Sequence, residues 1–205
     1  MGLKAPYLLE LIDANFDVTK LKSARLFRTA ECGMIVGHTD YNEFKSGFTR
    51  VHVVLATHAG AFNAEDRMVR HFRAGEVWFL DGRRPHSAGV TTREERIHLV
   101  LDFDPRMDVR DVTALHVLEA GRCMVPARVE RPKVSKEEDQ ALRGLAPLLS
   151  DFTFDSIFGL LARLHVLRDE PVAACYARLE RLARERGDAA LVERARDLRR
   201  RMLGG

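Results

Sequence analysis

Apolar and polar residues alternate along several short segments in the first half of the chain. In segment 48–55, Arg50 and His52 fall on one face, because side chains two residues apart in an extended strand point to the same side. The intervening valines and a leucine form the opposite face. Segment 96–103 repeats the pattern, with Arg96 on the polar face. Both segments are therefore predicted to be strands with one apolar face and one face that carries polar side chains.

Other short strands are predicted between turns, with no helix among them. Their ranges are 25–28, 33–37, 68–73 and 76–80. Residues 57–67 are predicted to form a loop, and 81–85 have the composition of a turn. A short helix that begins at Pro6 precedes the strands. Short strands joined by turns favour an antiparallel barrel or sandwich over a sheet of βαβ units.

The pattern becomes helical after Pro132. Glu138 follows Ser135 at the spacing of a capping box, which predicts the start of a helix. Four helices are predicted, from 135 to about 149, around 157–164, from 171 to 187, and over 188–202. We therefore expect a mostly β fold with a helical C-terminal part. The predicted domains are a core at 1–130 and a helical region at 131–205, packed on the core or on a partner subunit.

Composition narrows the class of protein. The 205 residues are 46% hydrophobic and 31% charged, as in ordinary globular chains. The three cysteines are odd in number and widely spaced, which argues against a disulfide framework and for a reducing compartment. No signal pattern is seen in the first residues, and no apolar run approaches the roughly 20 residues of a membrane span. The expected location is cytoplasmic, without membrane association.

Charge does not favour a nucleic-acid partner. The net charge is only +3, and the arginines of segment 178–201 are interleaved with acidic residues. A solvated, salt-bridged surface is the better interpretation. Apolar positions such as Leu179 and Leu191 on the same helices need a partner surface, which is either the barrel or a second subunit. A homodimer is therefore left open.

A metal site is suggested by the tripeptide His38-Thr39-Asp40. His38 and Asp40 lie two residues apart and can grip one ion together if the backbone is extended. His86, after the strand at 76–80, is a plausible third ligand. Two histidines and one carboxylate on one face leave the other positions open, as a non-haem Fe(II) oxygenase requires. Arg96 adds weight, because a fixed guanidinium can bind a dicarboxylate through two hydrogen bonds.

Several motifs together resemble a known family, the bacterial proline cis-4-hydroxylases. These belong to the aspartyl/asparaginyl β-hydroxylase-like dioxygenases that use iron and 2-oxoglutarate. The resemblance covers nearly the whole chain, including the helical region, and its main motifs are PYLLEL at 6–11, GHTDY at 37–41, RVHVVL at 50–55, GEVWFLD at 75–81, PHSAG at 85–89 and RIHLV at 96–100.

The resemblance implies a double-stranded β-helix and a role for each residue of the site. The Fe(II) ligands would be His38, Asp40 and His86. Arg96 would bind the distal carboxylate of 2-oxoglutarate. Arg50 and His52 would point toward the metal. Arg25 would bind the carboxylate of an amino-acid substrate. Tyr41 and Asn42 directly follow the ligand pair, so they are candidates for substrate contact. The implied reaction is hydroxylation of a free amino acid, proline or a close analogue, coupled to conversion of 2-oxoglutarate to succinate.

Other functions stay open at this point. Family members have a longer N-terminal portion that forms part of the wall over the substrate, whereas this chain reaches the shared Pro6 almost at once. That wall is expected to be absent, rebuilt or supplied by a partner. The alternatives are a non-catalytic barrel that binds a carboxylate, an oxygenase that acts on a peptide or carrier-bound residue, and a sensory barrel with a DNA-binding helical tail.

Overall fold

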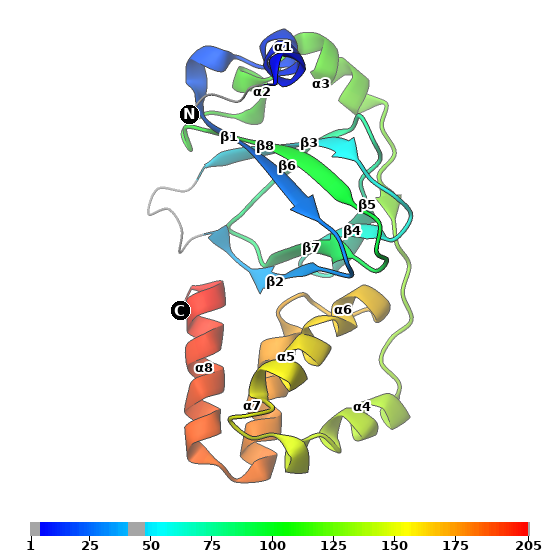
Figure 1. Ribbon diagram of the computed structural model, residues 1–205, viewed down its shortest axis with the longest axis vertical. Helices are drawn as coiled ribbons and strands as arrows, with labels where there is room; N and C mark the ends of the chain where they lie inside the picture. The colour runs from blue at the N-terminus through cyan, green and yellow to red at the C-terminus, as the bar shows by residue number, and fades with distance from the viewer. Residues whose placement is uncertain (1–4, 41–47, 205) are drawn as a thin grey trace.

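Two antiparallel β-sheets form the core of the protein (Figure 1). The structure is a computed structural model that describes residues 5–40 and 48–204. One sheet has the strand order β1-β8-β3-β6 and the other β2-β7-β4-β5-β9. The strands are β1 (Leu21–Thr29), β2 (Met34–His38), β3 (Thr49–Ala56), β4 (Ala61–Glu65), β5 (Met68–His71), β6 (Val77–Leu80), β7 (His86–Val90), β8 (Arg96–Phe103) and β9 (Ala127–Arg128).

The chain passes repeatedly from one sheet to the other. β1 pairs with β8 in the first sheet, whereas β2 pairs with β7 in the second. β3 returns to pair with β8, and β4 goes back to pair with β7. Two facing sheets with this alternation are the arrangement of a jelly roll or double-stranded β-helix. The predicted fold class is confirmed.

Short helices cover the outer face of the first sheet. They are α1 (Pro6–Asn15), α2 (Val109–Val112) and α3 (Leu115–Arg122). Ile12 of α1 and Val112 of α2 pack against Val51, Leu99 and other buried residues of the sheet. Helix α1 begins at Pro6 as predicted. The sequence pattern missed α2 and α3, which are short segments between two longer patterns.

The remaining helices lie below the second sheet in Figure 1. They are α4 (Lys136–Arg143), α5 (Phe154–Ala162), α6 (Leu164–Leu167), α7 (Ala174–Arg186) and α8 (Ala189–Leu203). Their shared core includes Tyr176 and Leu179, and Met34 and Val36 of β2 pack against it. Phe62 of β4 packs with Val172, which precedes α7. The helical region is thus in direct contact with the second sheet. The boundary at residue 130 between two domains remains a prediction.

Two predicted boundaries were wrong. Residues 57–67 were expected to be a loop, but Ala61–Glu65 forms β4 between β5 and β7. Its small and polar residues hide the alternation, although four of its five residues are buried. The helix predicted from 135 to about 149 was also too long, because α4 ends at Arg143 and a 3₁₀ turn follows at Ala146–Leu148. The predicted end of α7 at Gly187 is confirmed.

Several arginines of α7 and α8 are paired with carboxylates, some of them with the interleaved acidic residues, as predicted. Arg178 contacts Asp139 and Glu170, and Arg196 contacts Glu180. Arg200 contacts Glu193 and Asp197. Among the described residues, no helix has the length and apolar character needed to cross a membrane.

Candidate metal centre

His38, Asp40 and His86 converge at one end of the barrel. Each offers one ligand atom, and these atoms all lie within 4.8 Å of one another. The Nε2 atom of His38 is 3.5 Å from Asp40 Oδ1, and the Nε2 atom of His86 is 3.7 Å from the same oxygen. Two imidazoles and one carboxylate oxygen therefore face a common point, as a metal ion requires. No other such group of histidine, cysteine or acidic side chains was found among the described residues.

Strand pairing brings the two histidines together. His38 ends β2, His86 begins β7, and the two residues are directly opposite one another in the antiparallel ladder. Their ring centroids are 4.3 Å apart. The register shifts between Ile35 and His38, which indicates a β-bulge. Such a bulge changes which side chain faces the partner strand, and here it places one imidazole opposite the other.

Backbone carbonyls orient both imidazoles. The Nδ1 atom of His38 is 2.9 Å from the carbonyl oxygen of Val36, and Nδ1 of His86 is 2.9 Å from that of Arg84. Each Nδ1–H can donate to its carbonyl, which leaves the Nε2 lone pair for a metal. This is the usual arrangement of histidine ligands, where the second nitrogen is held by a hydrogen bond.

Arg50 on β3 holds the carboxylate of Asp40. Its Nη1 atom donates to Asp40 Oδ2 at 2.7 Å, so the other oxygen, Oδ1, is the one that faces the histidines. Arg50 Nε also donates to Asp102 Oδ1 at 2.7 Å. Asp102 lies on β8, directly opposite Arg50 in the ladder, and is 1% exposed. The two carboxylates fix the guanidinium, which in turn orients Asp40.

These surroundings favour the carboxylate form of Asp40 and the neutral form of His86. Burial alone would raise the pKa of Asp40, but the His38 hydrogen bond and the Arg50 charge lower it below its usual value. Burial, together with the neighbouring His38, lowers the pKa of His86. A carboxylate and neutral imidazoles are the ligand forms of these residues.

The turn before His86 fits closely against Asp40. The backbone N–H of Asp40 donates to the carbonyl of Gly82 at 2.8 Å. A Cβ atom at position 82 would lie 2.9 Å from Asp40 Cβ and Cγ, which is closer than real Cβ contacts. Only glycine therefore allows this turn to lie against the ligand without displacing it.

Arg96 is buried inside the barrel, and no carboxylate of the residues that the structure describes pairs with it. It is 2% exposed, and its Nη2 atom donates to Asn63 Oδ1 at 2.6 Å and to His98 Nδ1 at 3.0 Å. Its Nε has no hydrogen-bond partner in the described part of the chain, and none of the ion pairs found there involves Arg96. Burial lowers the pKa of Arg96 to about 10, so it still carries its charge at neutral pH. A buried unpaired cation is costly, so this position fits an anionic ligand.

Two histidines share the interior with Arg96. The rings of His52 and His98 are in edge contact, with centroids 5.8 Å apart, and Phe72 stacks beside His98 and Trp78. Burial lowers the pKa of His98 to about 3 and that of His52 well below its usual value. His52 Nδ1 and His98 Nε2 are buried without a partner among the described residues. Together with Arg96 Nε, these unpartnered polar atoms could form hydrogen bonds with a polar ligand such as a 2-oxo dicarboxylate.

The remaining predicted site residues are placed less centrally. Arg25 on β1 is ion-paired with Asp102, and its side chain is 36% exposed. It therefore belongs to the same charge network as Arg50 and Asp40 but keeps an exposed part. Tyr41 and Asn42 lie outside the described residues.

Sequence reasoning missed two partners of the predicted site residues. These are Asp102, which pairs with Arg25 and Arg50, and Asn63, which contacts Arg96. Asp102 is the only charged residue in the last five positions of β8, and a lone carboxylate in such an apolar strand is a usable signal. Asn63 was assigned to a loop, so no signal pointed to it. It lies on β4, and its side-chain Oδ1 accepts a hydrogen bond from Arg96.

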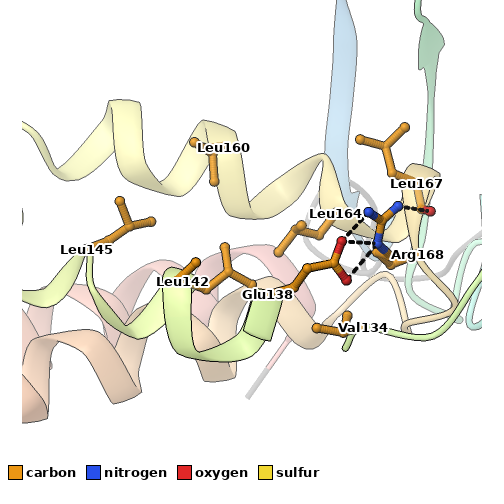
Figure 2. Close-up of a pocket in the computed structure, with 9 residues that line it drawn as sticks. Val134, Glu138, Leu142, Leu145, Leu160, Leu164, Leu167 and Arg168 are labelled. Atoms are coloured by element: carbon orange, nitrogen blue, oxygen red, sulfur yellow. Dashed lines mark hydrogen bonds and ion pairs between the residues drawn. The ribbon is translucent and has the colours of Figure 1, made fainter. Parts of the chain in front are cut away.

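A separate groove in the helical region carries no comparable chemistry (Figure 2). It is lined by Val134, Glu138, Ala141, Leu142, Leu145, Leu160, Leu164, Leu167 and Arg168. The two charged residues form an ion pair, with Arg168 Nε 2.8 Å from Glu138 Oε1. The rest of the lining is apolar, so the groove provides neither metal ligands nor a free charge.

Comparison with known proteins shows the family of this chain. Residues 2–105 match the family described as Aspartyl/Asparaginyl beta-hydroxylase. The L-proline cis-4-hydroxylase of Rhizobium meliloti (strain 1021) is 34% identical over 203 residues, which cover 97% of this chain and 70% of the relative. The chain belongs to the aspartyl/asparaginyl β-hydroxylase family. The resemblance seen in the sequence is confirmed.

This hydroxylase-family chain is also similar to other known proteins. Residues 117–205 match the family described as L-proline 3-hydroxylase, C-terminal. L-proline cis-3-hydroxylase 1 of a Streptomyces species is 29% identical over 98% of this chain and 70% of its own length. Among solved structures, a Cupin 2 conserved barrel domain protein from Salinispora arenicola CNS-205 aligns with a TM-score of 0.32 and 17% identity, over 54% of this chain and 92% of that one.

Proposed function

We propose that this protein is an Fe(II)- and 2-oxoglutarate-dependent hydroxylase of a free amino acid, with L-proline or a close analogue as the substrate. The convergence of His38 Nε2, His86 Nε2 and Asp40 Oδ1 carries the proposal. Family membership supports it, because the relatives at 34% and 29% identity are named as proline hydroxylases.

The three side chains would hold the iron on one face and leave the opposite positions for ligands. When bound, iron with 2-oxoglutarate and O2 supplies an oxidation that couples decarboxylation to succinate with hydroxylation of a C–H bond. Arg50 keeps Asp40 ionised and directs one of its oxygens toward the metal. The two backbone carbonyls keep both histidines in the tautomer that can bind it.

Arg96 would bind the distal carboxylate of 2-oxoglutarate. Its guanidinium is already desolvated and held by Asn63, so little ordering is required when the anion enters. The aromatic rings of Phe72 and Trp78 keep that interior apolar around the charge. A charge-assisted hydrogen bond in such surroundings is stronger than the same bond in water.

Arg25 is the candidate for the carboxylate of the amino acid. Asp102 anchors one side of its guanidinium, and the side chain remains 36% exposed. An anchored but accessible arginine can bind a small carboxylate with little loss of side-chain freedom. Tyr41 and Asn42 stay candidates for substrate contact on their position in the sequence.

Turnover of an amino-acid panel tests the proposal. Purified protein with Fe(II) and 2-oxoglutarate should release succinate and a hydroxylated product when L-proline or a related amino acid is added. His86→Ala should abolish the reaction because it removes a ligand. His116→Ala is the matched control, since His116 is an exposed imidazole on α3 bonded to Asn15.

Two results would contradict the proposal in different ways. If the protein did not bind iron, the proposed metal-binding role of the triad would be wrong. Iron and 2-oxoglutarate binding without succinate release from any free amino acid would instead point to a peptide, a carrier-bound residue or a non-catalytic carboxylate-binding role.

A further inference from the structure

The residues beside the metal ligands face the helical region. Neighbouring side chains in a strand point to opposite sides of the sheet, so Ser87 is turned away from the barrel interior when His86 points into it. Gly37 lies within the bulge, and its place is shown directly, because a Cβ there would meet Val172 of the helical region. The outer face of this sheet is covered by the helices that follow residue 135 (Figure 1).

Tyr176 on α7 donates a hydrogen bond from its hydroxyl to the carbonyl oxygen of Gly37. Tyr176 is fully buried, with 0% exposure. A Cβ at position 37 would lie 2.5 Å from Val172 Cγ1, so the absence of a side chain lets the helical region approach the strand. The residue that immediately precedes His38 is therefore fixed from outside the barrel.

His165 on α6 makes the equivalent contact beside the other histidine. Its Nε2 atom is 2.6 Å from Ser87 Oγ, and both residues are buried. The ring of Phe62 on β4 meets His165 edge-on, with centroids 6.2 Å apart. Burial lowers the pKa of His165 to about 4, so the ring is neutral at neutral pH. Ser87 immediately follows His86, so the second histidine ligand is also braced from the helical side.

A third contact reaches the residue between the two ligands of the tripeptide. The backbone N–H of Thr39 donates to the carbonyl oxygen of Met202 on α8, at 2.8 Å. The helical region thus contacts Gly37, Thr39 and Ser87, each of which is adjacent to a residue of the triad. Three helices that are separate in the sequence supply these contacts.

We propose that the helical region is the outer support of the metal centre, with Tyr176 and His165 as positioning residues that act on His38 and His86 through Gly37 and Ser87. The inference rests on the proposed metal-binding function. A buried tyrosine hydroxyl costs stability unless it is bonded, and phenylalanine would fill the same space without that cost. The bond to Gly37 therefore indicates a requirement for position rather than for packing.

Metal binding by the full chain tests this role without relying on turnover. Co(II) is added to the metal-free protein, and its visible d–d absorption reports both affinity and ligand geometry. Tyr176→Phe and Ser87→Ala each remove one hydrogen bond and keep the surrounding packing. Each should weaken Co(II) binding about threefold to tenfold and change the shape of the absorption band.

Thr153→Val is the matched control in the helical region. The Thr153 hydroxyl donates to the carbonyl of Leu148 at 2.6 Å and accepts from the backbone N–H of Ser150 at 2.9 Å, so both bonds lie within the helical region. It should leave Co(II) affinity and the band unchanged. The midpoint of thermal unfolding of each metal-free variant separates loss of stability from loss of ligand geometry.

The outcomes distinguish the two proposals. Wild-type affinity and an unchanged band in both Tyr176→Phe and Ser87→Ala, with binding abolished by His86→Ala, would overturn the positioning role and leave the proposed function intact. Failure of the wild-type protein to bind either Co(II) or Fe(II) would overturn the proposed function and this inference with it.

Discussion

Arg50 and Arg96 lie on neighbouring strands of one sheet and are both buried, yet their surroundings differ in charge. Arg50 on β3 contacts two carboxylates, Asp40 and Asp102. Arg96 on β8 contacts an amide oxygen and an imidazole, and no carboxylate among the described residues. The sheet thus has one end where the arginine charge is balanced and another where it is not.

The difference separates two uses of a buried arginine. A guanidinium between two carboxylates is satisfied by the protein itself, and its contribution is to hold Asp40 in place. An unpaired guanidinium costs free energy in the empty protein and recovers it when an anion arrives. Burial alone does not tell these roles apart, whereas the partners of each side chain do.

The largest expected effect is at Arg96. Arg96→Met should lower kcat/KM for 2-oxoglutarate about 10³-fold, because it removes a desolvated charge-assisted contact. It should not lower the free energy of unfolding of the ligand-free protein, since an unpaired buried charge is lost. Initial rates and urea unfolding measure the two quantities.

Arg96→Lys is the control for that change. Its kcat/KM for 2-oxoglutarate should lie between those of the wild type and Arg96→Met, because lysine keeps the charge and lacks the planar guanidinium. An unchanged KM for 2-oxoglutarate in Arg96→Met would show that the anion binds elsewhere.

The opposite pattern is expected at Arg50. Arg50→Met should lower the free energy of unfolding by about 3 kcal/mol, because two buried carboxylates lose a partner. Urea unfolding of the metal-free protein measures it. Arg83→Met is the control, since Arg83 is 82% exposed and solvent screens its ion pair with Asp81, so the free energy of unfolding should barely change. Equal losses in the two variants would contradict the assigned difference.

The last expected effect concerns the pH dependence of stability and the imidazole of His98, which lies beside Arg96. Burial and the Arg96 charge lower the pKa of His98 from 6.5 to about 3. Between these values the unfolded chain binds a proton at His98 that the folded protein does not, so the stability falls as the pH decreases through this window. The expected slope from His98 is about 1.4 kcal/mol per pH unit.

His98→Asn should reduce that slope by about 1.4 kcal/mol per pH unit, which corresponds to one proton. Urea unfolding at a series of pH values measures it. The same slope in variant and wild type would show that His98 is not the group responsible.

The strand period predicted part of this arrangement from the sequence. Alternation in 48–55 and 96–103 was sufficient to place Arg50 and His52 on one face of their strand and Arg96 on the polar face of its own, because the period of two holds within a regular strand. The tripeptide His38-Thr39-Asp40 with His86 suggested the triad, and the family resemblance gave its members the role of iron ligands. The partners that distinguish the two arginines were not predictable in this way.

Those partners depend on long-range register. Asp102 lies opposite Arg50 only because β8 pairs with β3 in one register, and Asn63 reaches Arg96 from the other sheet. The bulge that brings His38 opposite His86 likewise has no signature in the spacing of the residues. Local pattern determines which way a side chain points, but tertiary pairing determines what it meets.

The hydrogen bond between Thr39 and Met202 has a consequence for biosynthesis. The tripeptide that contains two metal ligands leaves the ribosome early, whereas its acceptor on α8 is made after the whole barrel. A nascent chain can therefore pair its strands before the loop between His38 and Asp40 receives its last backbone partner. Loading of the proposed iron is then expected to follow the synthesis of α8, when the metal would enter a finished site.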